Sequence, residues 1–90
     1  ILEQVAIEID NATSSSVNID GYADNSGPDS INGPLSQKRA ESVESALKEL
    51  IKREDLKFEV EGHGSADPIG DNSTEEGRER NRRVSVTFEK

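Results

Sequence analysis

The chain has 90 residues, of which 30% are hydrophobic and 3% aromatic, and its formal net charge is -8. This length suits one domain with a small, mainly aliphatic core. The negative charge argues against a general binder of nucleic acid or of an anionic membrane, because both need a basic surface on the protein. The chain has no cysteine, which excludes disulfides and thiolate metal sites.

No apolar run approaches the roughly 20 residues of a membrane-spanning helix. Direct insertion of this domain into a membrane is therefore not expected. A chain that starts at Ile1 without Met and shows no signal peptide is expected to be an excised domain.

The first segment, residues 1–11, fits a helix or a strand, and its length favours the helix. The side chains that share its apolar helical face are Leu2, Val5, Ala6 and Ile9. Residues 17–22 alternate between apolar and polar side chains, which predicts a strand with one buried face. From Asp24 to Pro34, the Asx, Gly and Pro residues predict a loop.

Ser36 is the expected N-cap of a long helix that ends near Lys52. One apolar stripe at helical spacing supports it: Ala40, Val43, Ala46, Leu47, Leu50 and Ile51. A second strand is expected at 58–60, a glycine-rich loop at 62–73, a short helix from 74 and a last strand at 84–88. This alternation predicts a two-layer α+β or α/β sandwich.

Three charged residues stand out as candidates for binding. Asp24 follows a strand and opens a glycine-containing loop, which suits either a functional side chain or an Asx-turn cap. Helical spacing places Arg39 at the margin of the apolar stripe, and counting by two from Val84 predicts that Arg82 is on the apolar side of the last strand, at its start. An arginine at a core edge needs an anionic partner, either a structural acid such as Asp24 or a ligand carboxylate.

Catalysis and metal binding find little support in the residue pattern. His63 is the only histidine, so neither a histidine-based metal site nor a histidine pair is expected. Ser36, His63 and Asp67 could form a triad on paper, but no nucleophile-elbow sequence accompanies them. The segment from Asp24 lacks the Gly and Glu of a calcium loop. No catalytic residue, metal or cofactor is therefore expected.

Four motifs occur in order along the chain: GYADNSG at 21–27, N-x-x-LSxxRAxxVxxxL at 32–47, DPIGDNSTEEGR at 67–78 and NRRV at 81–84. With these motifs the chain resembles, over about residues 1–88, the OmpA-like C-terminal domain family. This family is the peptidoglycan-associating module of outer-membrane proteins, peptidoglycan-associated lipoproteins and flagellar stator proteins.

The resemblance implies a single α+β domain over residues 1–90, a two-layer βαβ-type fold with a mixed sheet and helices packed on one face. The family's first strand has no clear counterpart before Ile1. Gly62-His63-Gly64 also replaces the aromatic-bearing turn that is usual in the family.

The resemblance further implies non-covalent binding of peptidoglycan through the diaminopimelate residue of its peptide stem. The implied binding residues are Asp24 and Arg39, assisted by Arg82, with the site shaped by Asn32, Asn25 and Ser26. Such a domain would anchor a membrane-bound parent protein to the cell wall on the extracytoplasmic side of the bacterial envelope, without being an enzyme. The alternative is a protein–protein interaction or homodimerisation module in which Asp24 and Arg39 pair with each other.

Overall fold

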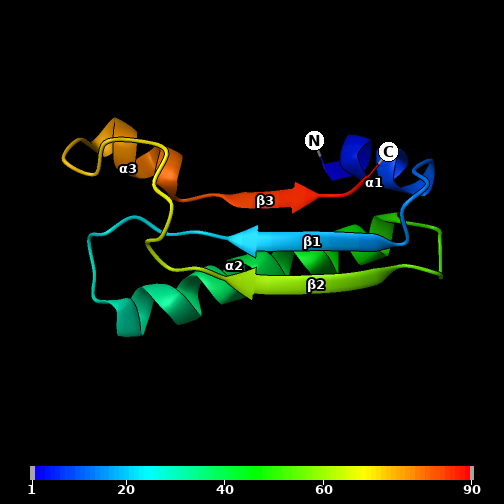
Figure 1. The fold of residues 1–90 in the computed structure, drawn as a ribbon, viewed down its shortest axis with the longest axis horizontal. Helices are drawn as coiled ribbons and strands as arrows, with labels where there is room; N and C mark the ends of the chain where they lie inside the picture. Colours follow the sequence, from blue (N-terminus) through cyan, green and yellow to red (C-terminus); the bar gives the residue numbers. More distant parts are fainter. Residues whose placement is uncertain (1, 90) are drawn as a thin grey trace.

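The computed structural model describes residues 2–89 and contains a three-stranded sheet with three helices (Figure 1). In chain order the elements are α1 Leu2–Asp10, β1 Ser16–Gly21, α2 Asp29–Leu50, β2 Lys57–Gly62, α3 Glu75–Asn81 and β3 Val84–Thr87. The strand order is β2-β1-β3, with β1 parallel to β2 and antiparallel to β3. The predicted α+β fold with a mixed sheet is confirmed.

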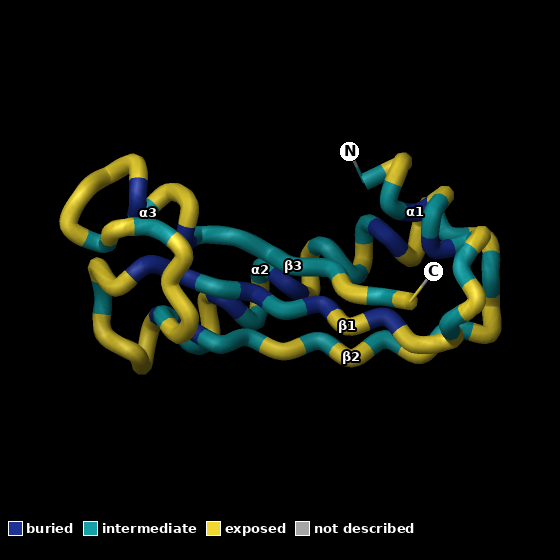
Figure 2. Tube along the Cα trace, turned by 45° about the horizontal axis from the view of Figure 1, so that its top comes forward, coloured by how far each residue is buried: buried dark blue, intermediate teal, exposed yellow. Residues whose placement is uncertain are grey.

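The core lies between α2 and one face of the sheet (Figure 1). Alternation along β1 buries Val17 and Ile19 completely, and Figure 2 shows this alternation along the strand. Ala40 and Leu47 of α2 are equally inaccessible and belong to the same core cluster. Ala6 and Ile9, from the apolar face of α1, complete the buried part of this cluster. The first segment is thus a helix, as its length predicted.

Two glycines bring α2 very close to the ends of β1 and β2. Gly21 and Gly62 are directly opposite each other in the parallel pair. A Cβ atom on Gly21 would clash with the carbonyl oxygen of Ser36, and one on Gly62 would clash with the backbone of Gln37. This close approach places the Ser36–Ala40 turn of α2 at the carboxyl end of β1, three residues before Asp24.

The predicted start of the long helix was wrong. The helix begins at Asp29 rather than after Ser36, with Pro28 in an extended conformation at its N-cap. Pro34 lies inside this helix, where its missing N–H removes only one helical hydrogen bond. Asp29 in the first turn stabilises the positive end of the helix. Ser36 is fully buried, and its hydroxyl accepts a hydrogen bond from the Gly64 N–H at 2.9 Å.

The remaining elements lie where the sequence predicted them. The N-cap of α3 is Thr74, whose Oγ1 accepts from the N–H of Gly77 at 3.0 Å. Within residues 2–89, β3 pairs with β1 alone, so no counterpart of the first family strand is present in that range. Across the same range, no helix combines the length and apolar character that crossing a membrane requires.

Candidate functional site

Asp24 lies just beyond the end of β1 and is only 5% exposed. Its Oδ1 accepts from the backbone N–H of Ser26 at 2.9 Å and from the Ser26 hydroxyl, and its Oδ2 accepts from Nη1 of Arg82 at 2.6 Å. The hydrogen bonds from the Ser26 side chain and backbone, followed by that from Arg82, lower the pKa of Asp24 to about 2. Asp24 is therefore a carboxylate at any physiological pH.

The loop after Asp24 is held in shape by Asn32. Asn32 as a residue is 5% exposed, and its side-chain Nδ2 donates to the carbonyl oxygens of Asp24 at 3.1 Å and Gly27 at 2.9 Å. Asn25 and Ser26, also expected at the site, are exposed on this loop. Three of the expected residues, Asp24, Asn25 and Ser26, thus lie in one loop. The amide nitrogen of Asn32 stabilises this loop through its two hydrogen bonds.

Arg82 connects α3 to this loop. It is the C-cap residue of α3 rather than a residue of the last strand, so its predicted place on an apolar strand face was wrong. While Nη1 contacts Asp24, Nη2 donates to Oε1 of Glu75 at 2.7 Å. Hydrogen bonds to Glu75 and then to Asp24 raise the pKa of Arg82. The guanidinium is held between two carboxylates.

Asn81 positions Arg82 and was missed by the sequence reasoning. This residue is 1% exposed, and its Oδ1 accepts from the N–H groups of Ile69 and Gly70, both at 2.7 Å. Its Nδ2 donates to the Gly70 carbonyl at 3.1 Å and to Oδ1 of Asn72 at 2.8 Å. The available signal was its position at the start of the NRRV motif.

Arg39 differs from Arg82 because no ion pair joins it to an acid among residues 2–89. Its Nη1 is buried and has no hydrogen-bond partner in the described part of the chain. Arg39 precedes Ala40, whose side chain lies against Gly21, so α2 carries Arg39 at the same end of the sheet as Asp24. A buried cationic donor without a partner is unfavourable by about 1–3 kcal/mol or more. The expected alternative, a salt bridge between Arg39 and Asp24, is not formed, since Asp24 contacts Arg82.

The arrangement combines the Asp24 and Glu75 carboxylates with two guanidinium groups, of which that of Arg82 is already paired with both acids. Each carboxylate oxygen can accept more than one hydrogen bond, so Asp24 retains acceptor capacity for a cationic donor. The free Nη1 of Arg39 suits an anion, and a planar guanidinium favours a carboxylate or phosphate.

Comparison with known proteins places the chain in a family. The sequence model of the OmpA family matches residues 1–82. The probable lipoprotein YiaD of Escherichia coli is 41% identical over 88 residues, which cover 97% of this chain and 39% of YiaD. The chain belongs to the OmpA family.

One further relative in sequence and one solved structure are also similar to this chain. The peptidoglycan-binding protein ArfA of Mycobacterium tuberculosis is 42% identical to this OmpA-family chain over 86 residues, covering 96% of the chain and 26% of ArfA. The peptidoglycan-associated lipoprotein from Burkholderia pseudomallei has the same fold, with a TM-score of 0.81 and 29% identity, covering 94% of this chain and 71% of that protein.

The curated relatives are longer than this chain, which spans 39% of YiaD and 26% of ArfA. Names such as outer-membrane lipoprotein YfiB and outer membrane porin F, both of Pseudomonas aeruginosa, place these relatives in the bacterial envelope. This agrees with the expected location of the OmpA-family chain in the cell envelope, outside the cytoplasm.

Proposed function

We propose that residues 1–90 form a single domain that binds peptidoglycan non-covalently through the diaminopimelate residue of the peptide stem. The observation that carries the proposal is the buried Nη1 of Arg39, which has no partner within residues 2–89. A fold that leaves a guanidinium nitrogen buried and unpaired gains stability when an anion pairs with it. The names of two relatives, the peptidoglycan-binding protein ArfA and the peptidoglycan-associated lipoprotein from Burkholderia, support peptidoglycan as the polymer that is bound.

Diaminopimelate ends in a carbon that bears both an ammonium and a carboxylate group. In the proposed complex, Arg39 donates two parallel hydrogen bonds to the carboxylate. Asp24 accepts from the ammonium, while Arg82 and Ser26 hold the Asp24 carboxylate in place. Asn32 keeps the loop closed around this carboxylate. Because these groups are already ordered, little conformational entropy is lost on binding.

The role that follows is attachment of a longer envelope protein to the cell wall. A single site of this size binds with modest affinity, but many copies facing a polymeric wall bind with high avidity. Binding involves no covalent chemistry and no cofactor, and the net charge of -8 disfavours nucleic acid as a partner.

The alternative, an interaction or dimerisation module, required Asp24 and Arg39 to pair with each other. Asp24 instead contacts Arg82, which leaves Arg39 available to a ligand. This difference favours the cell-wall proposal over the homodimer.

The test is co-sedimentation of the 90-residue chain with purified sacculi that contain diaminopimelate. Arg39→Met keeps the aliphatic stem but removes the guanidinium, so it is expected to abolish binding. Lys38→Met is the matched control, because it removes one positive charge from an exposed neighbouring position of α2. If Arg39→Met still co-sediments like Lys38→Met while both stay folded, the assigned site is wrong.

A further inference from the structure

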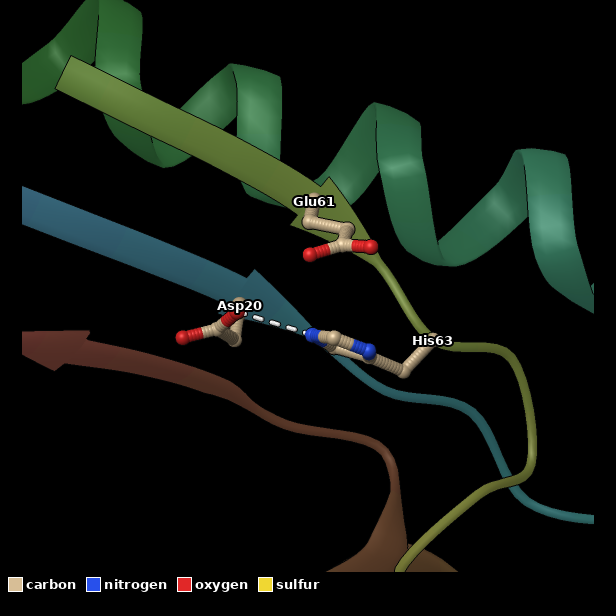
Figure 3. Close-up of side chains that lie close together, drawn as sticks. All are labelled: Asp20, Glu61 and His63. Carbon is tan, nitrogen blue, oxygen red and sulfur yellow. Dashed lines mark hydrogen bonds and ion pairs between the residues drawn. The ribbon is translucent and has the colours of Figure 1, made fainter.

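A second group of side chains converges on the face of the sheet that α2 leaves open. Asp20 of β1 and Glu61 of β2 are direct partners in the parallel register, so their side chains project from the same face. His63 lies two residues beyond Glu61 and turns its ring toward both carboxylates (Figure 3). One potential ligand atom from each of the three residues lies within 4.8 Å of the other two.

The imidazole of His63 is held in position from several sides. Its Nε2 lies 2.8 Å from Oδ1 of Asp20, and its ring stacks on Tyr22 with centroids 5.0 Å apart and an interplanar angle of 21°. Arg83 covers the Tyr22 ring, with its Cζ 3.8 Å from the ring centroid. The backbone N–H of His63 also donates to the Gly21 carbonyl at 2.9 Å. A ligand that used this imidazole would find it already oriented.

The spacing of these atoms suits a metal ion. Two ligands at the tetrahedral angle on a zinc ion with bonds of about 2.1 Å are about 3.4 Å apart. The hydrogen-bonded pair of His63 Nε2 and Asp20 Oδ1, now 2.8 Å apart, therefore has to separate only slightly to hold the ion. Glu61 is exposed, so its side chain can move inward to supply the third ligand. The two carboxylates balance the charge of a divalent cation, and the imidazole binds as a neutral ligand.

The surroundings of the cluster also suit a cation. A shallow pocket of about 500 Å³ opens beside it, lined by Asn18, Asp20, Glu59, Val60 and Glu61. Glu59 adds a third carboxylate to this pocket. The volume of the pocket leaves room for water molecules. Two cations lie near the cluster. Lys57 has its Nζ 3.9 Å from Oε1 of Glu59. Arg83 stacks on Tyr22 and donates to the carbonyl oxygens of Asn81 and Asp67.

We propose that Asp20, Glu61 and His63 form a binding site for a divalent transition-metal ion of the zinc class, with water completing the coordination. An imidazole with two carboxylates is a ligand set for Zn²⁺ and its neighbours, whereas Mg²⁺ and Ca²⁺ prefer oxygen ligands alone. The single histidine of this chain is sufficient, because carboxylates from two adjacent strands provide the other ligands.

Metal binding at this site would join the carboxyl ends of β1 and β2. The loops that leave these ends are already connected by the Ala23 N–H, which donates to the Gly64 carbonyl at 2.6 Å. A metal ion that binds the folded chain and not the unfolded chain therefore raises its melting temperature. This site lies outside Asp24 and Arg39, so the proposal is independent of peptidoglycan binding.

The first experiment titrates the untagged 90-residue chain with ZnCl₂ by calorimetry, with MgCl₂ as the comparison. Zn²⁺ is expected to bind with 1:1 stoichiometry and more tightly than Mg²⁺. His63→Gln and Asp20→Asn are each expected to lower Zn²⁺ affinity about tenfold or more. Glu59→Gln is the matched control, since it removes one charge from the same pocket but none of the three proposed ligands, and it should bind Zn²⁺ nearly as wild type.

A second measurement, NMR of the His63 ring, uses the wild-type chain and so does not depend on whether the variants fold. His63 is the only histidine, so the ¹⁵N resonances of its ring report on metal binding in the wild-type chain without ambiguity. Zn²⁺ is expected to shift the ring nitrogen resonances at one equivalent and to raise the melting temperature. The proposal is overturned if these resonances do not respond to Zn²⁺, or if Zn²⁺ binds no more tightly than Mg²⁺.

Discussion

The guanidinium of Arg82 donates to the carboxylate of Asp24 at 2.6 Å, across 58 residues of sequence. This ion pair connects the end of α3 to the loop that follows β1. Because the Asp24 side chain is only 7% exposed and that of Arg82 is 31% exposed, the pair is largely shielded from water on the acid side. Arg82 therefore supports Asp24, whereas Arg39 remains available for a ligand.

Acid should destabilise the fold through Asp24. Its pKa is about 2 in the folded chain and near 3.8 when it is unperturbed, because Ser26 and then Arg82 donate to the ionised form. A lowered folded pKa contributes stability that is complete above about pH 4 and is lost as the pH falls toward 2. Urea unfolding at stepped pH should show this loss in the wild type, and Asp24→Asn should lack this part of it. Parallel losses in both proteins would contradict the lowered pKa.

The two arginines should separate binding from stability. Arg82→Met leaves the buried Asp24 carboxylate without its cationic partner, so the free energy of unfolding should fall by about 1–3 kcal/mol. Arg39→Met removes a buried donor that has no partner in the described part of the chain, so the unliganded chain should be at least as stable as wild type. Sacculus binding should be lost more completely in Arg39→Met. Denaturant unfolding and co-sedimentation are measured on the same samples. If Arg82 were the primary ligand contact, Arg82→Met would lose more sacculus binding than Arg39→Met.

The close contact of α2 with β1 should make Gly21 intolerant of substitution. The added methyl group of Gly21→Ala meets the Ser36 carbonyl oxygen and the Ala40 side chain, so a loss of about 1–3 kcal/mol is expected. Gly33→Ala is the matched control, because a Cβ there meets no atom within 4 Å apart from its chain neighbours and the backbone of its own helix. Alanine at this position should change stability by less than about 1 kcal/mol, because the usual gain from replacing a helical glycine is offset by crowding of its Cβ against the ring of Pro34. Equal effects of the two substitutions in thermal unfolding would refute this packing.

Asn81 should be a structural residue whose loss indirectly impairs the site. Asn81→Asp replaces the donor to the Gly70 carbonyl with a buried negative charge, so the fold should lose about 2–3 kcal/mol. The exposed Asn11 provides a control, and Asn11→Asp should change stability by less than about 0.5 kcal/mol. Hydrogen exchange should report the loss first in residues 69–72. Unchanged protection of these amides in Asn81→Asp would exclude the proposed role.

The proposed ligand chemistry predicts which cell wall is bound. A peptide stem with lysine in place of diaminopimelate offers the ammonium but no carboxylate, so Arg39 would stay unpaired. A site that hydrogen-bonds a polar group rejects the analogue that lacks it, and we expect a loss of about a hundredfold or more. Amidation of the diaminopimelate carboxylate should also weaken binding. Titration with the three muropeptides at one salt concentration tests this, and equal affinities would rule out the paired-charge mechanism.

Local patterns in the sequence were sufficient to predict most of the elements. The alternation around Val17 and Ile19 and the apolar stripe from Ala40 determine which faces are buried, because strand and helix periods place these side chains on one side. The start of α2 could not be predicted in this way. Pro34 looks like a helix breaker, yet seven residues of helix precede Ser36, and the burial of that serine against Gly64 arises only in the folded chain.

The motifs determined which residues belong to the candidate site, but not which of them pair. Asp24, Arg39 and Arg82 are all visible in the sequence, and either arginine could have neutralised Asp24. Only the packing of α3 beside the β1 loop decides that Arg82 does so and that Arg39 keeps a free Nη1. In the same way, the parallel register of β1 and β2 brings Asp20 and Glu61 to His63. Spacing along the chain carries information about one element at a time, whereas the distance between charges on different elements depends on how those elements pack.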